Sequence, residues 1–251
     1  MKIGLIGTGH IGVAMVHNLA QAGHDIMVSR RSEVHSSSLV AAYHNVSAGE
    51  NDDVMSFAET VIVAVRPTMA ESVLASLNFN SDQKLLSVMA AVSFETLRTL
   101  AKPATKIAVT IPLECVSNGG CPLPVFGNQS IVHELFGHNN PIVEVKEEAH
   151  LNGYFSASTV LTSVMDIMAA SRDWLGDTTA NASGAEVYVN ALTSSYLRDL
   201  FADGEGALEK WRHRLAAEGT LNRQMLDHME AGDARSISHG GHEAIMKRLS
   251  S

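Results

Sequence analysis

The amino terminus reads Met1-Lys2-Ile3-Gly4-Leu5-Ile6-Gly7-Thr8-Gly9-His10-Ile11-Gly12. Ile3, Leu5 and Ile6 form an apolar run of strand length, and residues 7–12 fit the pattern G-x-G-x-x-G. Residues 13–22 then have helical spacing, and the glycine at position 23 is expected to end that helix. A strand, a glycine turn and a helix in this order predict a dinucleotide site rather than an ordinary turn between a strand and a helix.

Each glycine of the pattern has a separate expected task. The first allows a tight turn, the second lets the backbone approach a pyrophosphate, and the third lets the helix pack closely on the strand. The pyrophosphate would accept hydrogen bonds from the unpaired amides at the positive end of the helix. The residues predicted here to bind the cofactor are Gly7, Thr8, Gly9, His10, Ile11 and Gly12.

The second strand is predicted over Asp25–Ser29, and two arginines follow it. An NAD-specific site would carry a carboxylate at the end of this strand to bind the ribose hydroxyls, but this chain has Ser29 there. Arg30 and Arg31 can clamp a 2′-phosphate that a carboxylate would repel. The alternative is a pair of solvated loop arginines. Their place after the glycine pattern favours NADP(H), so Ser29, Arg30 and Arg31 are predicted to bind the cofactor.

The first part of the chain alternates strand and helix signals. Near-continuous apolar runs are typical of parallel strands covered on both faces, and helix-length segments at Met69–Leu77 and Phe94–Leu100 separate some of them. An alternating segment at Pro141–Val145 predicts an edge strand. This order predicts an α/β fold with a doubly wound, mostly parallel sheet over residues 1–146. The further predicted strands are Thr60–Val65, Lys84–Val88 and Lys106–Thr110.

Residues 147–251 have helical periodicity throughout and no strand signal, which predicts an all-α second domain. Val160, Leu161, Val164, Met165 and Met168 would share one broad apolar face. Because so much apolar helical surface more often pairs with another subunit than faces water, we expect a homodimer, or a higher homo-oligomer, through this domain. The predicted helices are Ser158–Ala170, Ala185–Phe201, Ala207–Ala216 and Ser236–Leu249.

Two further segments lie where parallel strands end, at the edge of the sheet where α/β proteins bind ligands. Ala64-Val65-Arg66-Pro67 ends the strand that begins at Thr60, and its proline fixes the turn. Met89-Ala90-Ala91 follows the strand at Lys84, and Ala90 would lie beside the nicotinamide. We therefore add Ala64, Val65, Arg66, Pro67 and Ala90 to the predicted cofactor site.

Composition narrows the functional classes. The 251 residues carry a formal net charge of −9, which argues against a nucleic-acid partner. The two cysteines, Cys115 and Cys121, form no framework and are expected to be free, buried thiols in a reducing cytoplasm; a disulfide between them is the alternative. The glycines of the amino terminus argue against a secretory signal, and no apolar run is long enough to span a membrane. No zinc, phosphate-loop or serine-hydrolase motif is present, so no metal site is predicted.

Along most of its length the chain resembles the pyrroline-5-carboxylate reductase family. The resemblance rests on the glycine pattern, on Ala64–Pro67 (where the family usually has Lys for Arg66) and on Val145-Lys146-Glu147-Glu148 at the domain junction. Ser156-Ala157-Ser158 stands where the family has a Ser-Gly-Ser-Gly-Pro-Ala segment. The more specific match is Glu218-Gly219-Thr220-Leu221, which resembles the family's Gly-Gly-Thr-Thr loop and is followed by Met229-Glu230-Ala231-Gly232 and Arg235.

This resemblance implies hydride transfer from NADPH to the carbon of a cyclic imine that carries a carboxylate, in proline biosynthesis. It further implies that the loop contributes across a dimer, binds the carboxylate and places a hydroxyl near the imine nitrogen. Thr220 is the implied catalytic residue, and Ser156, Ser158, Glu218, Gly219 and Thr220 are the implied substrate-binding residues. The chain departs from the family where Leu221 replaces the hydroxyl-bearing second threonine, and where Glu218 replaces a glycine.

Three alternatives stay open at this point. A protein that binds NADP(H) without turnover would explain Leu221 and Glu218. An F420-dependent reductase of NADP shares the glycine pattern but does not need the long helical half. A β-hydroxyacid dehydrogenase shares the two-domain layout but uses a lysine on the first helix of the second domain, and no lysine lies between Lys146 and Lys210.

Overall fold

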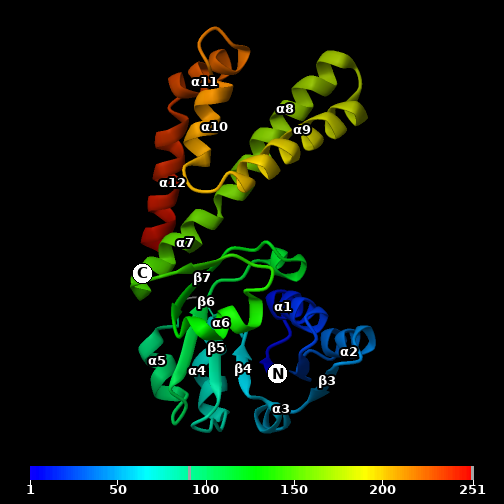
Figure 1. Ribbon diagram of the computed structural model, residues 1–251, viewed down its shortest axis with the longest axis vertical. Coiled ribbons are helices and arrows are strands. Elements are labelled where there is room, and N and C mark those ends of the chain that lie inside the picture. Colours follow the sequence, from blue (N-terminus) through cyan, green and yellow to red (C-terminus); the bar gives the residue numbers. More distant parts are fainter. Residues whose placement is uncertain (90–91, 250–251) are drawn as a thin grey trace. The chain divides into compact units, whose positions relative to one another are not determined.

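The computed structural model describes residues 1–89 and 92–249, and it divides the chain into two compact units. The first unit is Met1–Tyr154 and the second is Phe155–Ser251. Figure 1 shows strands in the first unit and helices throughout the second. The domain boundary predicted after Lys146 lies shortly before this division. The α/β fold followed by an all-α region is confirmed.

An eight-stranded sheet forms the centre of the first unit, in the order β3-β2-β1-β4-β5-β6-β7-β8. All neighbouring strands run parallel except β6 and β7, which are antiparallel. From β1 the chain first adds β2 and β3 on one side and then adds β4 and the later strands on the other side, as in a doubly wound sheet. The strands are β1 (Lys2–Ile6), β2 (Asp25–Ser29), β3 (Val46–Gly49), β4 (Thr60–Val63), β5 (Lys84–Ser87), β6 (Lys106–Thr110), β7 (Leu123–Gly127) and β8 (Ile142–Glu144).

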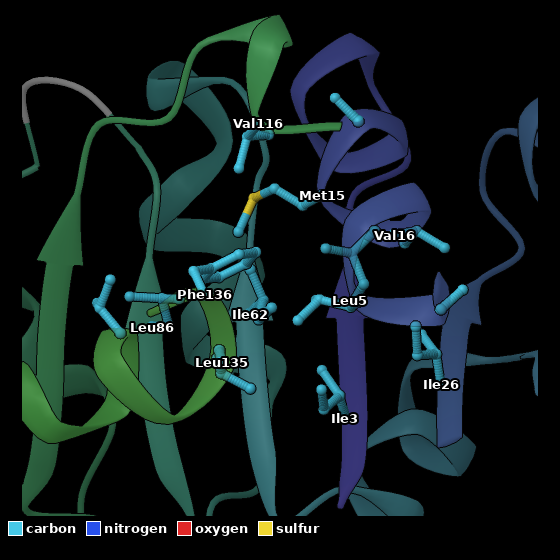
Figure 2. Packing of buried hydrophobic residues seen from close by; sticks show 14 of the residues in the cluster. Ile3, Leu5, Met15, Val16, Ile26, Ile62, Leu86, Val116, Leu135 and Phe136 are labelled. Atoms are coloured by element: carbon cyan, nitrogen blue, oxygen red, sulfur yellow. The ribbon is translucent and has the colours of Figure 1, made fainter. Parts of the chain in front are cut away.

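Helices cover both faces of this sheet, which explains the continuous apolar runs of its strands. On one face, α1 (His10–Gln21) and α6 (Gln129–Phe136) pack on a cluster of buried side chains (Figure 2). Met15, Val16 and Phe136 are fully buried in that cluster. The remaining helical segments of the unit are α2 (Glu33–Ala42), α3 (Asn51–Phe57), α4 (Pro67–Ser76), α5 (Phe94–Leu100) and the short 3₁₀ helices η1 (Glu114–Asn118) and η2 (Glu148–His150).

The packing on the other face depends on the glycine at position 4, in β1. A Cβ atom on Gly4 would lie 2.7 Å from Val54 Cγ1 and 2.8 Å from Ala58 Cβ, so α3 approaches the strand more closely than a side chain would allow. The amino-terminal strand is therefore buried between α1 and α3. The carboxyl end of β1 lies next to the carboxyl end of β4, because the two strands pair in parallel.

Most predicted strands are confirmed, with small changes at their ends. The strand expected over Thr60–Val65 ends at Val63, and the one expected over Lys84–Val88 ends at Ser87. The strand expected over Pro141–Val145 is β8, at the edge of the sheet. Two strands, β3 and β7, were missed by the sequence patterns.

The second unit is made of helices joined by short turns. α8 and α9 form an antiparallel hairpin (Figure 1), in which Ala180 adopts a left-handed conformation at the end of α8. Asn181 then caps α9 by accepting a hydrogen bond from Gly184 N at 2.9 Å. The helices from the end of the first unit onward are α7 (Leu151–Ser158), α8 (Val160–Thr179), α9 (Ala182–Ala202), α10 (Ala207–Leu215), α11 (Leu221–Ala231) and α12 (Ala234–Leu249).

The hairpin exposes an unusual amount of apolar surface for a single chain. Leu161 and Met165 on α8 are 54% and 57% exposed, and Val164 and Ile167 are exposed as well. Trp174 on α8 is 68% exposed. On α9 the exposed apolar side chains are Val187, Tyr188, Leu192, Tyr196 and Leu197.

Both cysteines are free, but the expectation that both are buried is wrong for one of them. Cys121 is fully buried, whereas Cys115 is exposed because η1 places it on the outer side of a short helical turn. Burial and the neighbouring Cys115 thiol raise the pKa of Cys121 to about 11. Among the described residues, no helix has both the length and the apolar character needed to cross a membrane.

Candidate functional site

The first and third glycines of the pattern are required by the fold itself. Gly7 has φ +103°, and a Cβ atom on it would lie 2.6 Å from the carbonyl oxygen of Ala64. A Cβ atom on Gly12 would lie 2.3 Å from the carbonyl oxygen of Gly7 and 3.2 Å from Leu5 Cδ2. The turn between β1 and α1 is therefore packed so tightly that side chains cannot enter at these two positions.

The second glycine is in the opposite situation. A Cβ atom on Gly9 would meet no protein atom within 4 Å, and the residue has ordinary extended backbone angles of φ −76° and ψ −177°. No steric contact and no unusual backbone conformation therefore requires a glycine here. Gly9 is the N-cap of α1, where no side chain accepts a hydrogen bond and the first turn carries no acidic residue. The open surface at Gly9 and the unpaired first amides of α1 form a cradle that suits an anionic group.

The end of β2 is tied directly to this turn. Ser29 is buried, and its Oγ accepts a hydrogen bond from Gly7 N at 3.0 Å. The two predicted arginines follow, and both are exposed. Arg30 Nη2 donates to the carbonyl oxygen of Ala48 at 3.2 Å, which fixes that guanidinium beside β3. The structure therefore brings Ser29 to the glycine turn and leaves the arginines accessible at the carboxyl end of β2, where sequence reasoning placed them.

Thr8 and a residue that the sequence patterns missed complete the turn. Thr8 is 3% exposed, and its Oγ1 has no hydrogen-bond partner, so a buried polar atom is left over in the centre of the turn. The carbonyl oxygen of Thr8 accepts a hydrogen bond of 2.6 Å from Nδ1 of His35, which lies on α2. The ring of His10 lies 6.3 Å from that of His35. Polar groups from the glycine turn, α1 and α2 therefore meet at one place.

The segment at the end of β4 lies against the same turn. The amide of Ala64 donates to the carbonyl oxygen of Ile6 at 2.9 Å, which continues the pairing of β1 with β4. Arg66 is the N-cap of α4 and Pro67 its first residue, and both are exposed. The predicted Ala64–Pro67 segment thus borders the glycine turn. Ala90, predicted to lie beside the nicotinamide, falls outside the described residues.

The predicted substrate residues on α7 are engaged within the second unit. Ser156 is buried, and its Oγ donates to the carbonyl oxygen of His242 at 3.1 Å and lies 3.2 Å from His242 Nδ1. Ser158 Oγ donates to the carbonyl oxygen of Phe155 at 2.8 Å. The first of these serines joins α7 to α12, and the second bonds within its own helix.

The predicted substrate loop connects α10 to α11. Gly219 has φ +78°, a left-handed conformation that favours glycine. Thr220 is the N-cap of α11: its Oγ1 accepts from Arg223 N at 3.1 Å and donates to the carbonyl oxygen of Ala217 at 2.7 Å. Leu221, at the position of the family's second threonine, is 84% exposed. The Thr220 hydroxyl is therefore already engaged in local hydrogen bonds, including a longer one of 3.4 Å to the carbonyl oxygen of Leu215.

Three comparisons place this geometry among known proteins. Residues 2–91 match the family model described as NADP oxidoreductase, coenzyme F420-dependent. This segment contains the glycine turn, both arginines and Ala64–Pro67. The match confirms the predicted class, an NADP-dependent oxidoreductase, and the predicted cofactor, NADP(H). No curated protein matches the chain.

Solved structures match the chain over nearly its whole length. A pyrroline-5-carboxylate reductase from Coxiella burnetii is similar with a TM-score of 0.85 and 18% identity, over 99% of this chain and 97% of that chain. A Plasmodium falciparum pyrroline carboxylate reductase with NADP bound is similar with a TM-score of 0.82 and 15% identity, over 99% of this chain and 97% of that chain. An imine reductase from Pseudomonas sp. is similar with a TM-score of 0.63 and 12% identity, over 99% of this chain and 92% of that chain. The chain thus has the fold of the pyrroline-5-carboxylate reductases, and its amino-terminal part is of the NADP oxidoreductase type.

Proposed function

We propose that this chain is an NADPH-dependent reductase that acts on the C=N bond of a small cyclic imine carboxylate, with pyrroline-5-carboxylate as the first candidate. The observation that carries the proposal is the open cradle at Gly9, next to the accessible Arg30 and Arg31. The full-length likeness to a pyrroline-5-carboxylate reductase supports the choice of reaction. With this substrate, the reaction would belong to proline biosynthesis in the cytoplasm.

The residues of the first unit have distinct tasks in this proposal. The amides of His10, Ile11 and Gly12 bind the pyrophosphate at the start of α1, where the positive end of the helix dipole favours an anion. Arg30 and Arg31 bind the 2′-phosphate as charge-assisted donors. When bound, NADPH supplies the hydride. The protein's own contribution is to hold the coenzyme, position the imine and exclude water.

The substrate would be bound by the second unit. The backbone amides of Gly219 and Thr220 are the candidate donors to the carboxylate, and Glu218 must point away from it because like charges repel. Thr220 is the candidate donor to the imine nitrogen, and this task requires its hydroxyl to release the carbonyl oxygen of Ala217. Ser156 and Ser158 are candidates to line the same site.

The apolar face of α8 and α9 is the proposed interface of a homodimer. Leu161, Met165, Trp174 and Tyr188 are each more than half exposed in the single chain. Burying such side chains stabilises an assembly by about 25 cal/mol for each Å² of apolar surface removed from water. A second copy of this chain presents a face of the same chemistry.

A reductase assay tests the proposal. NADPH oxidation is followed by absorbance with pyrroline-5-carboxylate, with its six-membered homologue, and with cyclic imines that lack the carboxylate. We expect turnover that is fastest with a carboxylated imine. The absence of turnover with every imine, from a protein that binds NADPH, would refute the reaction but not the coenzyme.

A second candidate is a protein that binds NADP(H) without turnover. It is favoured by the Thr220 hydroxyl, which caps α11, and by Leu221, which cannot donate a hydrogen bond. Tight NADPH binding without oxidation by any imine or ketone would support this candidate. A deazaflavin of the F420 type should also be assayed as an acceptor of the hydride from NADPH, because the matching family model is described as F420-dependent.

A further inference from the structure

His35 is held in one orientation by the glycine turn. Its Nδ1 lies 2.6 Å from the carbonyl oxygen of Thr8, although the two residues are 27 positions apart. A carbonyl oxygen only accepts hydrogen bonds, so Nδ1 must carry the proton of this bond. The other ring nitrogen, Nε2, is then an acceptor in the neutral ring and a donor in the imidazolium.

The surroundings of this ring are suited to an anion. Thr8, the residue whose carbonyl oxygen is bonded to His35, also has a buried hydroxyl oxygen, Oγ1, without a hydrogen-bond partner. The ring of His10 lies 6.3 Å away at the first position of α1, whose first amides are unpaired. The ring of His10 on α1 faces His35, and the charged residues nearest to His35 in the sequence are Arg31 and Glu33.

We propose that His35 is a phosphoryl-binding residue of the coenzyme site: it joins α2 to the glycine turn through Nδ1 and donates from Nε2 to a coenzyme phosphate. This inference rests on the proposed NADPH site and extends it to a residue outside the glycine pattern and the arginine pair. Because Nδ1 already donates to Thr8, Nε2 donates only from the cationic ring, so a bound phosphate favours the protonated form of His35. The unpartnered Thr8 hydroxyl donates to the same phosphoryl group.

Two substitutions separate the two hydrogen bonds of the ring. His35→Asn places an amide nitrogen close to the position of Nδ1, so it keeps a donor for the Thr8 carbonyl oxygen but has nothing in place of Nε2. His35→Ala removes both. The matched control is His17→Asn, because Nδ1 of His17 is hydrogen-bonded to Tyr43 Oη at 2.8 Å farther along α1. Thermal unfolding of each variant checks that the fold is kept.

Calorimetric titration of the full-length wild type and variants with NADPH, NADH and 2′,5′-ADP tests the proposal. We expect His35→Asn to raise the dissociation constant for NADPH at least about tenfold, as for a lost hydrogen bond to a charged group, while His17→Asn leaves it unchanged. Wild type should take up more protons than His35→Asn when NADPH binds, as seen from binding enthalpies in two buffers. A purely structural role for His35 would not change that proton count.

The three ligands also identify the phosphate. A loss confined to NADPH and 2′,5′-ADP assigns the 2′-phosphate to His35, and an equal loss with NADH assigns the pyrophosphate. His35→Asn binding NADPH within twofold of wild type, with the same proton uptake, overturns this inference and leaves the proposed function standing. Wild type that does not bind NADPH overturns both.

Discussion

Substitution by alanine is expected to have opposite effects at Gly9 and at Gly12: it should impair the fold at Gly12 and coenzyme binding at Gly9. At Gly12 a Cβ atom would lie 2.3 Å from the carbonyl oxygen of Gly7, which neither backbone segment can relieve without a shift of α1. Overpacking of this kind costs about 1–3 kcal/mol. At Gly9 the new atom would meet nothing within 4 Å, and the backbone angles suit alanine.

The cost of Gly9→Ala to the fold is close to zero. Alanine is a poorer N-cap than glycine by a few tenths of a kcal/mol to roughly 1 kcal/mol. It also reduces the conformational entropy of the unfolded chain, which stabilises the native state by about 0.4–1 kcal/mol. The two effects offset each other. Coenzyme binding is a different matter, because the new methyl group occupies the surface where the pyrophosphate approaches the backbone.

Thermal unfolding and NADPH titration of the two variants check this reasoning. We expect Gly12→Ala to lower the Tm by roughly 2–4 °C for each kcal/mol lost. Gly9→Ala should keep the Tm of wild type but bind NADPH at least about tenfold more weakly, which corresponds to ~1.4 kcal/mol. A Gly9→Ala protein with wild-type affinity for NADPH would refute the placement of the pyrophosphate at Gly9.

Four other predictions follow from the same structure. Arg31→Ala should weaken NADPH binding at least about tenfold and leave NADH binding unchanged, because Arg31 is exposed and its guanidinium would pair only with the 2′-phosphate; equal losses in titrations with both coenzymes would contradict that assignment. Thr220→Ala should lower the free energy of unfolding by about 0.5–2 kcal/mol through loss of the α11 cap, whereas Thr220→Ser keeps it; if Thr220→Ala also abolishes reduction of the imine and Thr220→Ser retains it, the hydroxyl has both tasks. Tyr188→Glu should convert a dimer into a monomer in sedimentation, since it places a charge on the exposed face of α9, and an unchanged sedimentation coefficient would exclude that face as the interface. Burial raises the pKa of Cys121 to about 11, so the folded protein should react with one equivalent of a thiol reagent, at Cys115, near neutral pH and with two equivalents after unfolding. Because the pKa of Cys121 is higher in the folded than in the unfolded protein, its contribution to stability is fully present at pH values below the unfolded pKa and is lost as the pH rises toward 11.

The regular strands of the sheet could be predicted because their signal is local. β6 was predicted over its exact range, and so was β2. β7 was missed because Pro124 lies within it, and a proline usually argues against a strand. β3 was missed because Val46-Ser47-Ala48-Gly49 is short and has little apolar character. Pairing with the neighbouring strand decides the conformation of both segments.

The candidate site divides in the same way. The glycine turn has a spacing that can be read directly, and the structure brings Ser29 and Ala64 to it as expected. His35 has no such signal, since its bond to Thr8 depends on how α2 packs after the second strand. The use of the Thr220 hydroxyl as a helix cap also follows from the loop geometry rather than from residue type alone. Contacts between distant segments were the part that sequence patterns could not supply.

We propose above that a phosphorylated dinucleotide binds at the glycine turn and the two arginines, and the other assignments depend on this binding. Parallel titrations of the unmodified protein with NADPH and NADH test it most directly. We expect saturable binding of NADPH with an affinity at least about tenfold above that for NADH, which is the effect of a charge-assisted contact to the 2′-phosphate. Equal affinities, a preference for NADH, or no binding of either coenzyme would contradict it.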